Sequence, residues 1–158
     1  MTFQIHALPK TLFEDLFGVT DAELQKRGMI RVTATSEPGY PCRVSLQDAK
    51  VGEEPILLNY QHLDGSTPYA ASHAIYVRKN ATQVQMMPGQ IPEMLSSRLL
   101  SVRGFNRQNM MVEADVIEGQ DLAARLRALF SNVDVDVVHV RNAKHGCFAA
   151  KVTRKQGL

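Results

Sequence analysis

The feature that most limits the fold is a two-residue alternation of apolar and polar side chains in several short segments. Ile30, Val32 and Ala34, for example, alternate with charged or hydroxyl-bearing neighbours. Because successive side chains of a strand point to opposite faces, this alternation is typical of a sheet with one covered face. The candidate strands lie at 30–35, 42–46, 55–60, 73–77, 112–116, 135–141 and 147–153.

Four further segments carry the signals of short helices. Thr20 and Glu23 have the spacing of a capping box, and Gly28 would end that helix. Elsewhere apolar side chains recur every three or four residues, as on the buried face of a helix. The four expected helices span 9–17, 20–27, 92–100 and 120–131.

Strands and helices of these lengths predict an α+β fold. We expect a single domain over residues 1–158, with a largely antiparallel sheet and about four helices packed mainly on one side. The basic segment 151–158 is expected to fray as a solvated tail.

The charge balance argues against nucleic-acid and membrane partners. The formal net charge is +2, and positive and negative residues alternate along most of the chain. No segment approaches the ~18 apolar residues of a membrane span. The start, MTFQIHALPK, lacks the charged and apolar regions of a signal peptide. We therefore expect a cytoplasmic protein with reduced cysteines. The oligomeric state is not predicted.

Sequence motifs for nucleotides, dinucleotides and α/β-hydrolase chemistry are missing. The chain has no Gly-x-Gly-x-x-Gly, no P-loop and no Gly-x-Ser-x-Gly. Its cysteines and histidines also lack the close, paired spacing of a structural zinc site. We expect no metal and no cofactor. The sequence leaves open whether the protein is an enzyme.

The stretch RNAKHGCF, residues 141–148, is expected to be the turn of a terminal hairpin. Aligning the apolar side chains of its two strands pairs Val140 with Phe148. In this register Cys147 shares the other face with His139 and Arg141. A slip of one residue would instead place Cys147 in the core.

One hypothesis from this hairpin is a thiol site. Nearby cations favour the thiolate, which is the nucleophilic form of cysteine, and His139 or His145 would act as its base. Cys147 and His139 are the catalytic candidates of a thiol-dependent enzyme or redox-sensing protein. The competing interpretation is that Cys147 is a small, partly buried apolar residue.

A second hypothesis, which we rank slightly higher, is a binding domain for a small anionic molecule. Basic side chains occur on otherwise apolar strands, and the candidate ligand-binding residues are Arg43, His73, Arg141 and His145. Arginine binds oxyanions through two parallel hydrogen bonds. The competing interpretations are a surface ion pair for Arg43 and a core imidazole for His73, beside Ile75.

A third hypothesis is a protein–protein interaction module without chemistry. The pairs Met86-Met87 and Met110-Met111 suit an adaptable apolar surface. Filling of the core explains the same residues.

Four segments of the chain resemble a known family. They are GYPCRVSL at 39–46, ASHAIYV at 71–77, RLLSVR at 98–103 and NAKHGC at 142–147. Together they resemble a family of small bacterial proteins catalogued as a domain of unknown function, and the likeness extends over nearly the whole chain. The resemblance implies a single-domain bacterial protein and brings no activity or catalytic residue with it.

Overall fold

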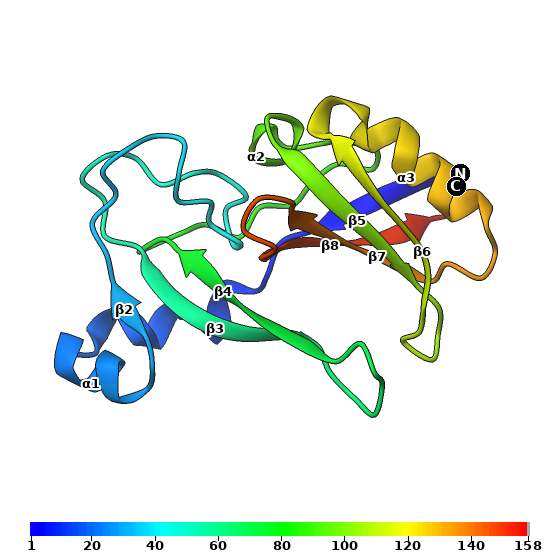
Figure 1. Cartoon of the computed structure of the whole chain (residues 1–158). Coiled ribbons are helices and arrows are strands. Elements are labelled where there is room, and N and C mark those ends of the chain that lie inside the picture. The colour runs from blue at the N-terminus through cyan, green and yellow to red at the C-terminus, as the bar shows by residue number, and fades with distance from the viewer. Residues whose placement is uncertain (158) are drawn as a thin grey trace.

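Two antiparallel sheets form the framework of the computed structural model, which describes residues 1–157 (Figure 1). The first sheet runs in the order β1 (Thr2–His6), β8 (Phe148–Lys155), β7 (Val137–Asn142), β5 (Leu99–Phe105) and β6 (Met111–Glu118). The second contains β2 (Ile30–Arg31), β3 (Ile56–Leu63) and β4 (Ala71–Val77). The expected antiparallel pairing is confirmed. The strands divide between two sheets, however, where one was expected.

The described residues contain three α-helices, so the expectation of about four is wrong. They are α1 (Asp21–Lys26), α2 (Glu93–Ser96) and α3 (Leu122–Ser131). The segment expected as the first helix forms two 3-10 turns, η1 (Lys10–Leu12) and η2 (Glu14–Gly18), and a third turn, η3 (Gly119–Asp121), precedes α3. Phe13 separates η1 from η2 with a φ of -128°, outside the helical range, and its ring is buried. The helical backbone is therefore interrupted at Phe13.

The helices also do not share one side of a single sheet. The apolar face of α3 packs on the five-stranded sheet, whereas α1 contacts β2 at the other end of the molecule (Figure 1). The capping box of α1 is as expected, because the Thr20 hydroxyl accepts a hydrogen bond from the Glu23 N–H at 3.2 Å. Gly28 follows with a φ of 73°.

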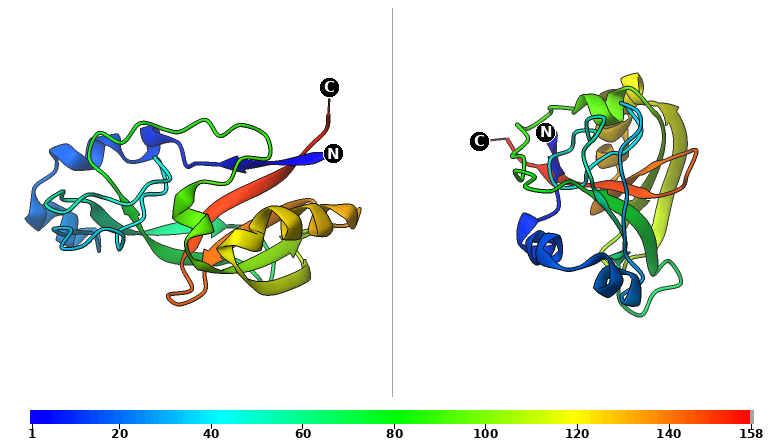
Figure 2. Two further views of the ribbon diagram at one scale, coloured as in Figure 1. Left: turned by 90° about the horizontal axis from the view of Figure 1, so that it is seen from above. Right: turned by 90° about the vertical axis from the view of Figure 1, so that its left-hand side faces the viewer.

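The main core lies between α3 and one face of the five-stranded sheet (Figure 2). Leu126 and Phe130 of α3 pack with Val102 of β5 and Val140 of β7. A second core, with Phe13, Ile56, Ile75 and Phe148 among its members, lies beneath β3 and β4. Phe148 belongs to β8, so this second core joins the two sheets.

The segment 42–46, expected as a strand, is a compact loop. Leu46 has a φ of 52°, and its N–H donates to the Cys42 carbonyl at 3.0 Å. Residues 41–46 are all buried. Alternation misled the prediction because both the apolar and the polar side chains of this loop lie inside the molecule.

The C-terminal segment forms a strand where a frayed tail was expected. Residues up to Lys155 belong to β8, which lies between β1 and β7 (Figures 1 and 2). Lys151 pairs with His6 on one side and with His139 on the other. Two neighbouring strands therefore hold this basic segment in place.

Candidate functional site

The candidate site lies on the face of the five-stranded sheet opposite α3. Residues that oppose one another directly in an antiparallel ladder project from the same face. Two rows cross the sheet in this way. The first contains Ala114, Arg103, His139 and Lys151 and the second contains Val116, Ser101, Arg141 and Phe148. The register thus brings two arginines and a histidine from β5 and β7 together.

The β3–β4 hairpin covers the β7–β8 half of this face. The His62 ring stacks on Phe148 with a centroid distance of 4.8 Å, and Tyr69, in the loop after β3, meets Phe105 at 6.0 Å. The β5–β6 half stays open, since Ala114 is exposed and Val116 is 60% exposed. The site therefore has a covered, histidine-rich side and an open side.

An irregularity in β8 changes the hairpin register that the sequence predicts. Val140 opposes Ala150, and Arg141 opposes Phe148, so the predicted pairing of Val140 with Phe148 is wrong. Ala149 is the extra residue between the two pairs, which makes this a β-bulge. The bulge lets Ala149 and Ala150 both join the main core, while Phe148 turns to the face of Arg141.

A second bulge places His62. Gln61 opposes Ser72 and Leu63 opposes Ala71, which leaves His62 as the additional residue of β3. Leu63 is buried and His62 is partly buried, so both lie on the inner side of the hairpin. His73 of β4 opposes Tyr60 and projects to that same inner side.

Three imidazoles form a hydrogen-bonded chain on the covered side. His62 Nε2 lies 2.7 Å from His73 Nδ1, and His62 Nδ1 lies 3.2 Å from His139 Nδ1. A neutral imidazole has one N–H donor and one acceptor nitrogen, so His62 donates to one neighbour and accepts from the other. The chain connects β4, β3 and β7, and so it spans both sheets.

Burial holds these imidazoles in their neutral form. It lowers the pKa of His62 to about 3 and that of His139 to about 4, and the charge of Arg141 contributes to both shifts. Burial lowers the pKa of His73 as well, with Arg141 and Arg103 adding to the effect. At neutral pH the positive charge of the cluster therefore resides on its arginines.

Arg141 has no partner for its charge. The residue is 6% exposed, and its Nε is buried without a hydrogen-bond partner. Its side chain makes no hydrogen bond or ion pair with any of residues 1–157. Burial, followed by the nearby charge of Arg103, lowers the pKa of Arg141 to about 10. A buried, unpaired cation is costly.

Arg103 is the second cation of the site and is partly buried. Its Nε lies 3.5 Å from the Ser101 hydroxyl, and no ion pair involves it within the described part of the chain. Most other arginines are paired with acids, as Arg98 is with Asp48 at 2.6 Å and Arg78 with Glu53 at 2.8 Å. The site thus concentrates positive charge that this molecule usually neutralises.

Of the residues singled out in the sequence, His73, His139 and Arg141 come together. Arg43 does not join them. It is 2% exposed, donates from Nε to the Phe148 carbonyl at 2.7 Å and donates from Nη1 to the Pro41 carbonyl. Burial lowers the pKa of Arg43 to about 10.

His145 and Cys147 lie at the turn of the terminal hairpin. His145 is exposed, and Cys147 is partly buried with its Sγ 3.7 Å from the His145 carbonyl oxygen. The side-chain hydrogen bonds of residues 1–157 do not link Cys147 to His139.

Two members of the cluster, His62 and Arg103, were not among the residues singled out for the site. A signal for His62 was present in the sequence, because alternate residues of a strand point to the same face. His62 is six residues after Ile56 and should therefore face inward with it. Arg103 lies just beyond the segment 92–100, which the sequence predicted as a helix. Arg103 opposes His139 only because β5 lies next to β7 in the sheet. The sequence carries no local signal that these two strands are neighbours.

Metal binding finds no support in the side-chain geometry. No three histidine, cysteine, aspartate or glutamate side chains among residues 1–157 are arranged to hold a metal ion. In the imidazole chain, His62 uses its two nitrogens toward two different neighbours. A metal would instead need one nitrogen from each ring directed at a common point.

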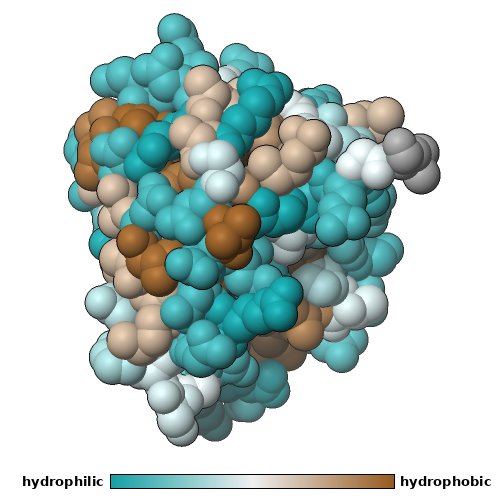
Figure 3. Space-filling model, turned by 90° about the vertical axis from the view of Figure 1, so that its right-hand side faces the viewer, coloured by the Kyte–Doolittle hydropathy of each residue, from teal (hydrophilic) through white to brown (hydrophobic). Residues whose placement is uncertain are grey.

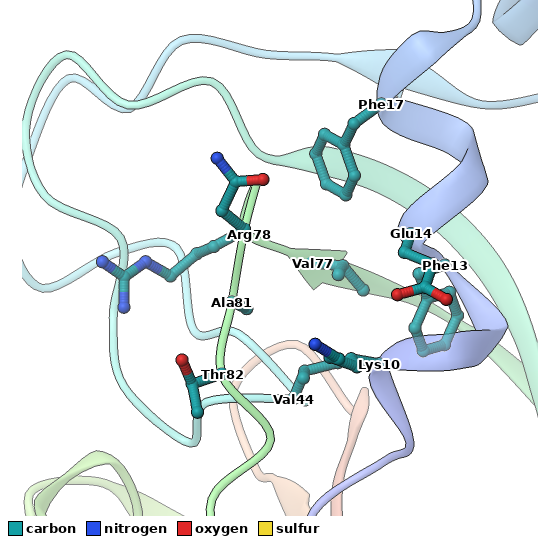
Figure 4. Close-up of a pocket in the computed structure, with 10 residues that line it drawn as sticks. Lys10, Phe13, Glu14, Phe17, Val44, Val77, Arg78, Ala81 and Thr82 are labelled. Atoms are coloured by element: carbon teal, nitrogen blue, oxygen red, sulfur yellow. The ribbon is translucent and has the colours of Figure 1, made fainter.

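A separate cavity lies between η1, η2 and the end of β4 (Figure 4). Lys10 and Glu14 carry opposite charges on one side of it, and the guanidinium of Arg78 extends away from them to bind Glu53. Phe17 and Val77 provide apolar lining. The cavity shows no preference for an anion or a cation, because Lys10 and Glu14 have opposite charges and Arg78 is already paired with Glu53.

Exposed apolar residues do not form one extended surface in Figure 3, where they appear as small patches separated by hydrophilic residues. The methionine pairs each divide between interior and surface. Met86 packs against the main core while Met87 is exposed, and Met111 packs near Phe105 while Met110 is exposed. Core packing therefore accounts for one methionine of each pair.

Comparison with known proteins places the chain in a family without an assigned activity. Residues 39–154 match the family model described as "Protein of unknown function (DUF1203)". The match covers more than half of the chain, which therefore belongs to this family. Searches of curated proteins and of solved structures return no match. In the part of the chain that the structure describes, every helix is too short or too polar to cross a bilayer.

Proposed function

We propose that this protein binds a small anionic molecule at the site formed by Arg103, Arg141 and the imidazole chain. The observation that carries the proposal is the guanidinium of Arg141, which is buried and makes no contact with an acid. A buried charge without a partner is rare in a folded protein. An anion that pairs with Arg141 would remove this energetic cost.

The surroundings of Arg141 support an oxyanion as the ligand. A guanidinium presents N–H donors in a fixed fork that matches the oxygens of a carboxylate or phosphate. Arg103 adds a second fork on the neighbouring strand, and His73 adds an imidazole that is only partly buried. The covering hairpin limits access of water, which strengthens each of these interactions.

A titration with inorganic phosphate tests the proposal. Isothermal calorimetry measures the affinity, and the chemical shifts of backbone amides in NMR spectra locate the binding site. We expect saturable binding with shifts centred on β5 and β7. Arg103→Gln should weaken binding at least ~10-fold, because charge-assisted hydrogen bonds contribute about 1.5–3 kcal/mol.

Arg107→Gln is the matched control, since it removes the same charge from an arginine whose side chain is 85% exposed and outside the site. Its phosphate affinity should equal that of the wild type. Equal losses in both variants, or shifts spread over the whole surface, would show that phosphate responds only to net charge and would refute the proposal.

The alternative of a thiol-dependent or redox-sensing protein retains one supporting observation. Cys147 directly precedes Phe148, whose carbonyl accepts a hydrogen bond from the buried cation Arg43 at 2.7 Å. A cation favours the thiolate. Alkylation of Cys147 at pH 7 should then be faster in the folded protein than in the urea-unfolded chain. Slower alkylation in the folded protein would count against this function.

A further inference from the structure

Resting on the anion site proposed above, we propose that its ligand is a phosphate monoester with an apolar organic group. The phosphoryl group would bind Arg103 and Arg141, and the organic group would lie on Ala114 and Val116. This assignment combines the charge of the site with the character of its open side.

The charge of the site calls for a dianion. Arg103 and Arg141 are both cationic, and no aspartate or glutamate is among the groups whose charges affect Arg141 or the imidazole chain. A monocarboxylate would neutralise one of the two guanidiniums and leave the other unpaired. A phosphate monoester carries close to two negative charges above its second pKa of about 6, together with three terminal oxygens.

The number of donors also fits three oxygens. Each guanidinium can bind two oxygens in parallel, and the partly buried His73 offers a further nitrogen beside them. The two arginines come from adjacent strands in successive rows of one face, so their forks approach from neighbouring positions. A planar carboxylate has only two oxygens and cannot occupy both forks fully.

The open side of the site is apolar. Ala114 directly opposes Arg103 and Val116 directly opposes Ser101, so both side chains lie on the face of the arginines. Both are exposed, and β6 is the outer strand of its sheet. A ligand anchored at Arg103 therefore extends across apolar surface, which favours an organic substituent over free phosphate.

Three probes separate these features: phenyl phosphate, inorganic phosphate and benzoate, each titrated at pH 7.5. We expect phenyl phosphate to bind at least ~10-fold more tightly than benzoate, because benzoate lacks the second charge. Phenyl phosphate should also bind more tightly than inorganic phosphate. The affinity difference between these two phosphates measures the apolar contact.

Val116→Ser tests the apolar contact directly. It should weaken phenyl phosphate binding by roughly 3-fold, in line with the apolar area lost, and leave inorganic phosphate affinity unchanged. The matched control is Val133→Ser, at a valine that is 87% exposed and lies outside the two rows. It should change neither affinity.

The outcomes distinguish this inference from the function on which it rests. If Arg103→Gln weakens phosphate binding but benzoate binds as tightly as phenyl phosphate, the anion site is supported. The same result would overturn the assignment of a phosphate monoester as its ligand. Phenyl phosphate no tighter than inorganic phosphate, or unaffected by Val116→Ser, would overturn the apolar contact. Failure of all three probes to bind would overturn both proposals.

Discussion

Single side chains link the stability of the protein to pH. Burial is the main factor that opposes protonation of His139, followed by the charges of Arg141 along β7 and of Lys151 beside it in the sheet. The His139 pKa of about 4, and that of His62 of about 3, lie below the ordinary value of 6.5. Between these values the unfolded chain binds more protons than the native protein.

We therefore predict that stability falls as the pH decreases from about 6.5 towards 4. Above pH 6.5 these histidines are neutral in both states, so their contribution no longer changes. Urea unfolding at a series of pH values measures the slope. His139→Gln should make the decline shallower because one depressed pKa is removed.

His145→Gln is the control, since it removes a histidine that is exposed at the hairpin turn. Its pH dependence should match that of the wild type. An unchanged slope in His139→Gln would show that the imidazole chain does not cause the acid sensitivity.

Residue-level predictions from the sequence succeeded where burial followed the alternation of a strand. His73 projects from β4 on the same face as the buried Ile75, as the alternation predicted. Arg43 differs from both interpretations considered for it. Its side chain is buried and binds backbone carbonyls inside the molecule. A charged residue at a polar position of an alternating segment gives no local sign of such burial.

At the scale of elements, two bulges decide which side chains meet. The bulge in β8 turns Phe148 towards the arginine face, and the bulge in β3 lets His62 face inward beside Leu63. A bulge is defined by the partner strand, since two residues on one strand oppose one on the other. Alternation within a single strand therefore predicts which residues share a face of the sheet. It cannot predict where a bulge reverses that pattern, as it does at Phe148 and after His62.

The junction of β6 with η3 gives a stability prediction. A Cβ built at Gly119 would lie within 3 Å of the carbonyl oxygens of Leu95 and Arg98, which belong to the α2 region. An added methyl group at Gly119 would overlap these carbonyl oxygens, so the backbone around α2 would have to shift to accommodate it. We expect Gly119→Ala to lower the free energy of unfolding by about 1–3 kcal/mol, the usual range for overpacking.

Gly18→Ala is the matched control for this junction, because nothing lies within 4 Å of a Cβ at Gly18. Its unfolding midpoint in urea should stay close to that of the wild type. If Gly119→Ala proved equally harmless, the close packing of α2 on η3 would be contradicted.

At the scale of the whole molecule, the site depends on how the two sheets meet. His62 and His73 come from the second sheet, whereas Arg103, His139 and Arg141 come from the first. Sequence patterns predicted the antiparallel pairing and most of the strands, because these depend on local alternation, but β1 and β5 were not among the expected strands. The order β1-β8-β7-β5-β6 and the docking of β3 on β8 depend on contacts between distant segments. Local patterns contain no signal for such contacts.

Arg43 connects the two sheets and so provides the last prediction. Its N–H donates to the Tyr76 carbonyl in β4 at 3.1 Å, and its side chain donates to the Phe148 carbonyl in β8. Arg43→Met would leave the Phe148 and Pro41 carbonyls without this donor. Since a buried unsatisfied acceptor costs about 1–3 kcal/mol, we expect a clear loss of stability in urea unfolding.

Phosphate affinity distinguishes this structural role of Arg43 from a role in binding. Because the Arg43 donors are directed at backbone carbonyls, the folded fraction of Arg43→Met should bind phosphate as tightly as the wild type. Arg107→Met, at an exposed arginine, should change neither stability nor affinity. A fully stable Arg43→Met variant with weakened phosphate binding would reverse the assignment, because Arg43 would then contact the ligand and the two sheets would be held together without it.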